Sequence, residues 1–137
     1  MDTKLKQAVR VNLARARGHL DYSFRKVTGI PLSNELTEEQ LEVLESFSSR
    51  FARYSDLIVS KYFRLLILEK DPAFRGSVID TLNLAEKFGW IDNAVAWRRI
   101  RELRNVAAHD YEAEEYRKLY AELIALTPEL RKVKIDL

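Results

Sequence analysis

The chain has 137 residues, of which 47% are hydrophobic and 32% charged, and it contains no cysteine. This length supports one hydrophobic core, so we expect a single domain over residues 1–137. The lack of thiols excludes disulfides, thiolate metal sites and a cysteine nucleophile. The start of the chain is polar and lacks the apolar stretch of a signal peptide, and no apolar run is long enough to span a bilayer. We therefore expect a cytoplasmic protein that does not enter the membrane.

Apolar residues recur every three or four positions along nearly the whole chain, which predicts helices rather than strands. In the first helix this stripe runs from Leu5 to Val27. Gly29 and Pro31 then end the helix, because neither residue suits a helix interior. Residues 28–36 are predicted to form a loop.

The second helix is predicted to be a long rod. Thr37 and Gln40 have the spacing of a capping box, and no glycine or proline follows before Lys70. Lys61 interrupts the apolar stripe, and its neighbour Tyr62 replaces it. A helix of this length is typical of a bundle or of a dimer interface.

Two shorter helices are predicted after the break at residues 71–72. Ser77 caps the third helix, which ends near Gly89. Asp92 is predicted to cap a fourth helix that runs from about Asn93 to about His109. Its inner face is predicted to carry Ala96, Ile100, Leu103 and Ala107, with Trp97 alongside.

A fifth helix is predicted to start after Tyr111 and to end near Pro128. With no strand pattern or repeat, the chain is expected to be all-α, an up-down helical bundle of four to five helices. Trp97 and the Phe and Tyr residues on the stripes are interpreted as core rather than as a ligand platform.

The net charge is only +2, but the charges are segregated. Residues 1–30 and 98–104 are rich in basic side chains, whereas residues 35–45 and 110–122 are acidic. Such segregation favours local binding of a polyanion. The alternative is that these segments are solvated helix faces that pair with one another.

Several common sites are missing from the sequence. It has no glycine-rich phosphate loop and no dinucleotide fingerprint, so we expect no cofactor. The two histidines lie ninety positions apart, and no cysteine is present, so we expect no metal site. His19 is interpreted as a surface or boundary residue, and the acidic cluster at residues 35–45 as favourable charge at a helix start.

The segment that ends the predicted fourth helix is chemically richer. Arg104, Asn105 and His109 follow three other arginines, at positions 98, 99 and 101. Arginine matches phosphate oxygens, and histidine transfers protons near neutral pH. These groups suffice for metal-free RNA cleavage, in which a base takes the 2′-OH proton and a cation stabilises the phosphorane.

Two observations complicate this interpretation. A cationic helix end is also an ordinary solvated terminus, because positive charge stabilises helix C-termini. Arg104 and His109 are moreover five residues apart, which is about 140° around an ideal helix. Either the helix distorts there, or a second copy of the chain completes the site.

The segment from Arg104 to His109 resembles the signature of HEPN domains, which is an arginine, a polar residue, three variable residues and a histidine. With Tyr111 it becomes Arg-x4-His-x-Tyr, the form seen in HepT-like ribonuclease toxins. The all-helical pattern and the chain length also agree with that family. The resemblance implies a homodimer in which two motifs form one metal-independent ribonuclease site that leaves 2′,3′-cyclic phosphates.

The same resemblance implies a role for each motif residue. Arg104 would stabilise the scissile phosphate, Asn105 would support it, and His109 would transfer or orient a proton. Arg98 and Arg101 are predicted to bind the RNA substrate.

The resemblance also implies a partner and a control point. HepT-like toxins belong to type II toxin–antitoxin pairs, in which a small nucleotidyltransferase antitoxin AMPylates the motif tyrosine, here Tyr111. The added anion would repel RNA. Two alternatives remain at this stage: a non-catalytic substrate-binding or docking subunit of a small nucleotidyltransferase, and a bundle that merely dimerises for stability.

Overall fold

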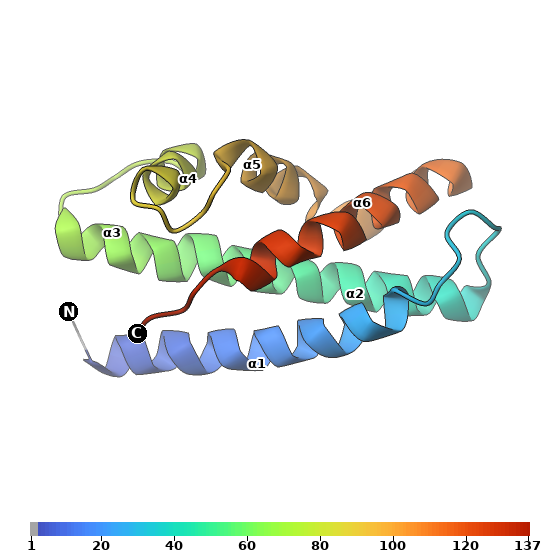
Figure 1. Ribbon diagram of the computed structural model, residues 1–137, viewed down its shortest axis with the longest axis horizontal. Helices are drawn as coiled ribbons and strands as arrows, with labels where there is room; N and C mark the ends of the chain where they lie inside the picture. The colour runs from blue at the N-terminus through green and yellow to red at the C-terminus, as the bar shows by residue number, and fades with distance from the viewer. Residues whose placement is uncertain (1–2) are drawn as a thin grey trace.

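The computed structural model describes residues 3–137, and over that range the protein is helical with no strand (Figure 1). These residues form five helices. The first is α1 (Thr3–Val27). The second is a long continuous rod made of α2 (Glu38–Leu57), a π-helical segment (Ile58–Phe63) and α3 (Arg64–Lys70). The other three are α4 (Val78–Lys87), α5 (Ala94–Leu103) and α6 (Ala113–Lys132). The predicted all-helical bundle of four to five helices is therefore confirmed.

The rod is the centre of the molecule. In Figure 1, α1 runs along one side of the rod, α4 and α5 lie on the other side, and α6 crosses in front. Helix α6 contacts α1, α2 and α5, so it closes the core. The chain ends beside the start of α1, where the Arg10 guanidinium donates to the Leu137 carbonyl at 3.4 Å.

Helix α1 has the predicted apolar stripe with one exception. Leu13, Leu20 and Val27 are buried, but Leu5 is 48% exposed. Its neighbour Lys6 pairs with Glu69 at the end of the rod. Leu5 therefore lies where the rod has no further side chains to cover it.

The rod begins as predicted. The Thr37 hydroxyl accepts from the Gln40 amide at 3.1 Å, and the Gln40 side chain accepts from the Thr37 amide at 3.0 Å. The rod is continuous to Lys70, and its π-helical segment coincides with the interruption in the apolar stripe. A π turn inserts an extra residue, which leaves Lys61 exposed and buries Tyr62.

Helix α4 also has the predicted ends. Ser77 caps it in a box with Asp80, and Gly89 follows its C-terminus with a φ of +78°. The Trp90 amide donates to the Ala85 carbonyl, which is the bond of a Schellman motif. Glycine suits this turn because its backbone lies in the left-handed region.

Helix α5 differs from the prediction at both ends. Its cap is Asn93 rather than Asp92, because the Asn93 side chain accepts from the amides of residues 95 and 96. The helix ends at Leu103 rather than near His109. The Arg104 amide donates to the carbonyl three residues earlier, at 3.5 Å, and the chain tightens there.

A short 3₁₀ turn, Val106–Ala108, replaces the predicted last turns of α5. The tighter winding changes which side chain faces inward. Val106 is buried, whereas Ala107, which was expected on the inner face, is exposed. The motif segment is therefore a connection between two helices and not the end of one.

The core confirms the interpretation of the aromatic residues. The largest fully buried side chains include Trp97, Tyr54, Tyr120, Phe47, Phe51 and Phe63. Helix α6 starts after Tyr111 as expected and includes Pro128 before it ends at Lys132. In residues 3–137, no helix has both the length and the apolar character needed to cross a membrane.

Candidate functional site

The motif lies in the connection between α5 and α6. Arg104 caps the C-terminus of α5, the 3₁₀ turn follows, and His109 adopts an extended backbone before α6 begins. Asn105, His109 and Asp110 are exposed, and Arg104 and Tyr111 are half-buried. The polar side chains of the motif are thus accessible from solvent.

Two contacts fix this connection to the rest of the protein. Val106 is buried in the core with 2% exposure, and the Ala108 amide donates to the Asn105 carbonyl at 2.9 Å. The Tyr116 hydroxyl, on the first turn of α6, donates to the His109 carbonyl. The backbone around the histidine is therefore held from both sides.

Arg101 and Arg104 meet at a carboxylate on the rod. The Asp56 Oδ1 atom lies 3.3 Å from Arg101 Nη1 and 3.4 Å from Arg104 Nη1. One carboxylate against two guanidiniums leaves a local charge of about +1. An oxygen shared by two arginines resembles the way a phosphate oxygen is bound.

Arg99 has a different environment. Its guanidinium binds both Glu122 oxygens, with Nη2 at 2.8 Å from Oε1, and its Nη1 lies 3.0 Å from Glu102. The bond to Glu122 raises the pKa of Arg99 above its ordinary value, and the same bond lowers the pKa of Glu122. Arg99 therefore ties α5 to α6.

Arg98 is half-buried, and no hydrogen bond or ion pair of its side chain occurs within residues 3–137. The structure does not join it to Asp56. The predicted RNA-binding pair therefore separates: Arg101 belongs to the arginine–carboxylate cluster and Arg98 lies apart from it.

Aromatic rings form a ladder from the motif into the core. The His109 and Tyr111 ring centroids are 6.0 Å apart, Tyr111 and Tyr116 are 5.4 Å apart, and Tyr116 stacks on Tyr120 at 6.0 Å. Burial, with help from the nearby charge of Glu45, raises the pKa of Tyr120 to about 12. The ladder places the imidazole at its solvent-exposed end.

The cationic and aromatic halves of the motif are not joined within one chain. Among residues 3–137, no hydrogen bond, ion pair or ring contact connects His109 with Arg101 or Arg104. The prediction of a helix to about His109 was wrong, because α5 ends at Leu103 and a 3₁₀ turn follows; a distortion near the helix end was one of the two explanations left open for the spacing of Arg104 and His109. Asp56 was not among the predicted site residues, although it is the one acidic residue in the rod between residues 46 and 68.

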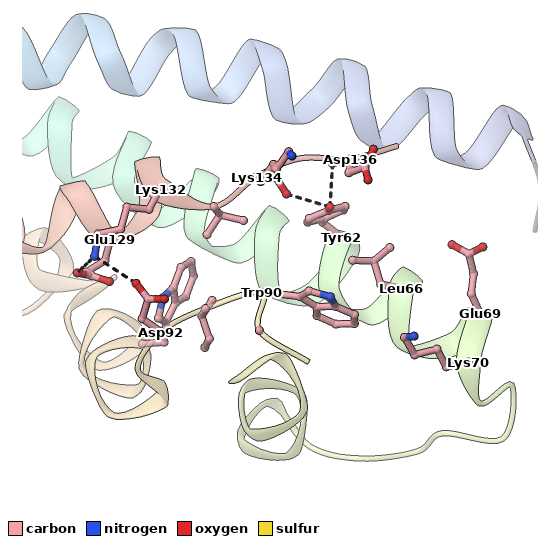
Figure 2. Close-up of a pocket in the computed structure, with 14 residues that line it drawn as sticks. Tyr62, Leu66, Glu69, Lys70, Trp90, Asp92, Glu129, Lys132, Lys134 and Asp136 are labelled. Atoms are coloured by element: carbon pink, nitrogen blue, oxygen red, sulfur yellow. Dashed lines mark hydrogen bonds and ion pairs between the residues drawn. The ribbon is translucent and has the colours of Figure 1, made fainter. Parts of the chain in front are cut away.

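A cavity lies at the N-terminal end of α5. It has a volume of about 590 Å³, and Figure 2 shows Tyr62, Trp90 and Lys132 around it. The Trp90 ring contacts Phe63 at 5.7 Å and Phe88 at 5.1 Å between centroids. No residue of the motif lines this cavity, so the chemistry of the motif is not located there.

Comparisons with known proteins add no assignment: no family model, no curated protein and no solved structure matches this chain. Within residues 3–137, no three His, Asp or Glu side chains gather in a way that could hold a metal ion. A functional proposal must therefore come from the chemistry and position of the motif residues.

Proposed function

We propose that this chain is a metal-independent endoribonuclease toxin of the HEPN class, HepT-like in type. The supporting observation is the pair Arg101 and Arg104, which share one carboxylate at the surface, with the exposed His109 five residues after Arg104 in the sequence. Two guanidiniums with one counter-charge favour an incoming phosphate. The imidazole supplies the proton transfer that cleavage requires.

The proposed reaction is an internal transesterification of RNA. A base takes the proton from a 2′-hydroxyl, and that oxygen forms a bond to the adjacent phosphorus. The bond from phosphorus to the 5′-oxygen breaks, and an acid returns a proton to that oxygen. Arg104 stabilises the charge that develops on the phosphoryl oxygens, His109 serves in proton transfer, and the Asn105 amide supports the phosphate.

The proposed active form is a homodimer. In one chain the arginine pair and the imidazole do not touch, so a second copy facing the first would bring His109 of one protomer to Arg104 of the other. The exposed position of the connection is compatible with such a pairing. A composite site would also explain why so few side chains are needed per chain.

Tyr111 is the proposed control point, and a small nucleotidyltransferase is the proposed antitoxin. The Tyr111 ring contacts the His109 ring, so an AMP group on its hydroxyl would place a phosphodiester beside the imidazole. In that transfer the phenol oxygen bonds to the α-phosphorus of ATP, and pyrophosphate leaves. The new anion would compete with RNA for the arginines.

Cleavage in the presence of EDTA tests the ribonuclease proposal. We expect the unmodified protein to cut single-stranded RNA and to leave 2′,3′-cyclic phosphates. His109→Ala should abolish this activity without loss of structure, because His109 is exposed. Lys87→Ala, which removes an exposed side chain from the other end of the bundle, should retain it.

Activity retained by a folded His109→Ala protein would contradict the proposal. A stable complex with the nucleotidyltransferase but no cleavage by unmodified protein would indicate a docking subunit instead.

Intact-mass measurement tests the modification separately. After incubation with the nucleotidyltransferase and ATP, we expect one AMP per chain and loss of cleavage. Tyr111→Phe should block the addition, whereas Tyr116→Phe, a change in the next ring of the ladder, should allow it. An AMP group on the Tyr111→Phe protein would place the modification elsewhere.

A further inference from the structure

A second basic feature lies between α1 and the rod, outside the motif. It is a hollow of about 350 Å³, lined by Asn12, Arg15, Ala16, His19, Arg53 and Leu57. No acidic side chain lines it. Within residues 3–137, neither Arg15 nor Arg53 forms an ion pair, and both are exposed. The hollow is therefore a cationic site without a counter-ion from the protein.

The hollow is adjacent to the arginine cluster of the motif. Arg53 and Asp56 are three residues apart on α2, so they are neighbours on the helix surface, with about 5–6 Å between their β-carbons. Asp56 in turn binds Arg101 and Arg104, which come from α5 and its C-terminal end. One turn of the rod thus separates the hollow on the α1 side from the arginine pair on the α5 side.

The surface between the two sites suits a nucleic-acid strand. Arg53 is exposed, and so is Ser49, which lies one turn before it on the same face of the rod; neither side chain is acidic. Between residues 46 and 60 the sequence contains only one acidic residue, Asp56, and it is already bound by two arginines. A phosphate chain that crosses the rod here meets no unpaired carboxylate of the rod.

The two sites also explain the uneven charge of the sequence. Arg15 comes from the basic segment at residues 1–30, and Arg101 and Arg104 come from the basic segment at residues 98–104. These segments are distant in sequence, and the fold places them on either side of one turn of the rod. Basic residues gathered from separate segments onto one face are typical of polyanion binding.

We infer that this hollow binds the phosphodiester backbone of single-stranded RNA next to the cleavage position. Arg15 and Arg53 bind phosphates, and Asn12 offers a neutral hydrogen-bond donor. Backbone contacts of this kind hold a strand in register without reading its bases. The identification of the polyanion as RNA rests on the proposed ribonuclease function. The basic track, which consists of Arg15 and Arg53 in the hollow and the arginine pair at Asp56, rests on the geometry.

Binding of an RNA that cannot be cleaved tests the inference. The probe is a fluorescent oligouridine of about twelve nucleotides with 2′-O-methyl groups throughout, whose affinity is measured by anisotropy over a range of salt concentrations. Arg15→Gln/Arg53→Gln removes two phosphate contacts. It should make the negative slope of log affinity against log salt shallower by about 1.4. It should also weaken binding on the order of tenfold at about 0.1 M salt.

The matched control is Arg25→Gln/Arg75→Gln, which removes two exposed arginines outside the track and changes the net charge equally. We expect its slope and affinity to stay close to those of the wild type. An Arg15→Gln/Arg53→Gln protein that binds like this control would overturn the inference. So would a double variant that binds RNA normally but loses a protein partner, because the hollow would then be a protein-docking site.

The same proteins separate this inference from the ribonuclease proposal. With a dinucleotide substrate, too short to reach the hollow, the double variant should turn over at the wild-type rate. If no protein cleaves RNA but the double variant still loses oligouridine binding, the track stands and the ribonuclease proposal fails. If cleavage occurs and binding is unchanged, the ribonuclease proposal stands and the track fails.

Discussion

Two sides of α5 carry arginines in opposite electrostatic situations. On the α6 side, the single guanidinium of Arg99 faces two carboxylates, Glu122 and Glu102. On the rod side, Arg101 and Arg104 share the single carboxylate of Asp56. The same residue type on one helix is therefore fully neutralised on one side and only half neutralised on the other.

This difference in carboxylate partners shows that exposure alone does not identify a functional arginine. The Arg99 side chain is 42% exposed, which is more than the 33% of Arg101 or the 28% of Arg104. Yet Arg99 has no spare positive charge, because its carboxylate partners exceed it in number. The ratio of cations to carboxylates, rather than solvent access, distinguishes a helix tie from a candidate phosphate site.

Replacement of one arginine by lysine on each side of α5 should give the largest difference in RNA cleavage. Arg104→Lys keeps the charge but loses the planar fork, so we expect RNA cleavage to fall roughly a hundredfold in kcat. Arg99→Lys should stay within about threefold of the wild type, because that side chain acts only in helix packing. Steady-state kinetics on one RNA substrate measure both, and equal losses would remove the distinction.

Asp56→Asn should have a smaller effect on RNA cleavage. Loss of the carboxylate makes the arginine pair more positive but lets the two guanidiniums repel each other and lose their orientation. We expect RNA to bind several-fold more tightly while kcat falls roughly tenfold. The separate measurements are the dissociation constant of non-cleavable RNA and the kcat of cleavable RNA.

Glu69→Gln is the matched control for this change. It breaks the Lys6–Glu69 pair, a partly exposed ion pair at the C-terminal end of the rod. We expect neither RNA affinity nor kcat to change in this protein. If Asp56→Asn behaves in the same way, Asp56 does not act through the arginines.

Glu122→Gln should have the smallest effect, and it should affect stability rather than RNA. The pair with Arg99 is partly exposed, so we expect a loss of about 0.5–1 kcal/mol and a fall of a few degrees in Tm. Because Arg99 lowers the pKa of Glu122, this contribution is present above the ordinary pKa near 4.5 and disappears as pH falls through the lowered value.

The measurement is Tm against pH for the wild type and the variant. The two curves should be parallel near neutral pH and should converge below about pH 4.5. Curves that stay equally far apart in acid would show that the ion pair does not cause the difference.

Much of the fold was predictable because its signals are local. The capping boxes at Thr37 and Ser77 and the glycine turn at Gly89 depend on residues within a few positions of one another. The interruption of the stripe at Lys61 coincides with the π-helical segment, although this part of the chain was predicted only as a continuous rod. These features follow from helix period and hydrogen bonding alone.

The end of α5 was not predictable in the same way. Residues 94–107 contain no proline or glycine, so nothing in the local sequence forbids a helix through Ala107. The chain tightens there because Val106 enters the core and the chain must turn back for α6 to pack on the rod. Tertiary packing overrides helix propensity when the two conflict.

The all-helical class, most helix boundaries and the set of reactive side chains from Arg104 to Tyr111 could be predicted from the sequence. Which arginines are neutralised depends on the packing of the helices, because Asp56 and Glu122 lie 45 and 23 residues away from their partners Arg101 and Arg99. The same holds for the approach of Arg15 and Arg53 to this cluster. Charge pairing between distant segments depends on how helices pack, and no local pattern encodes it.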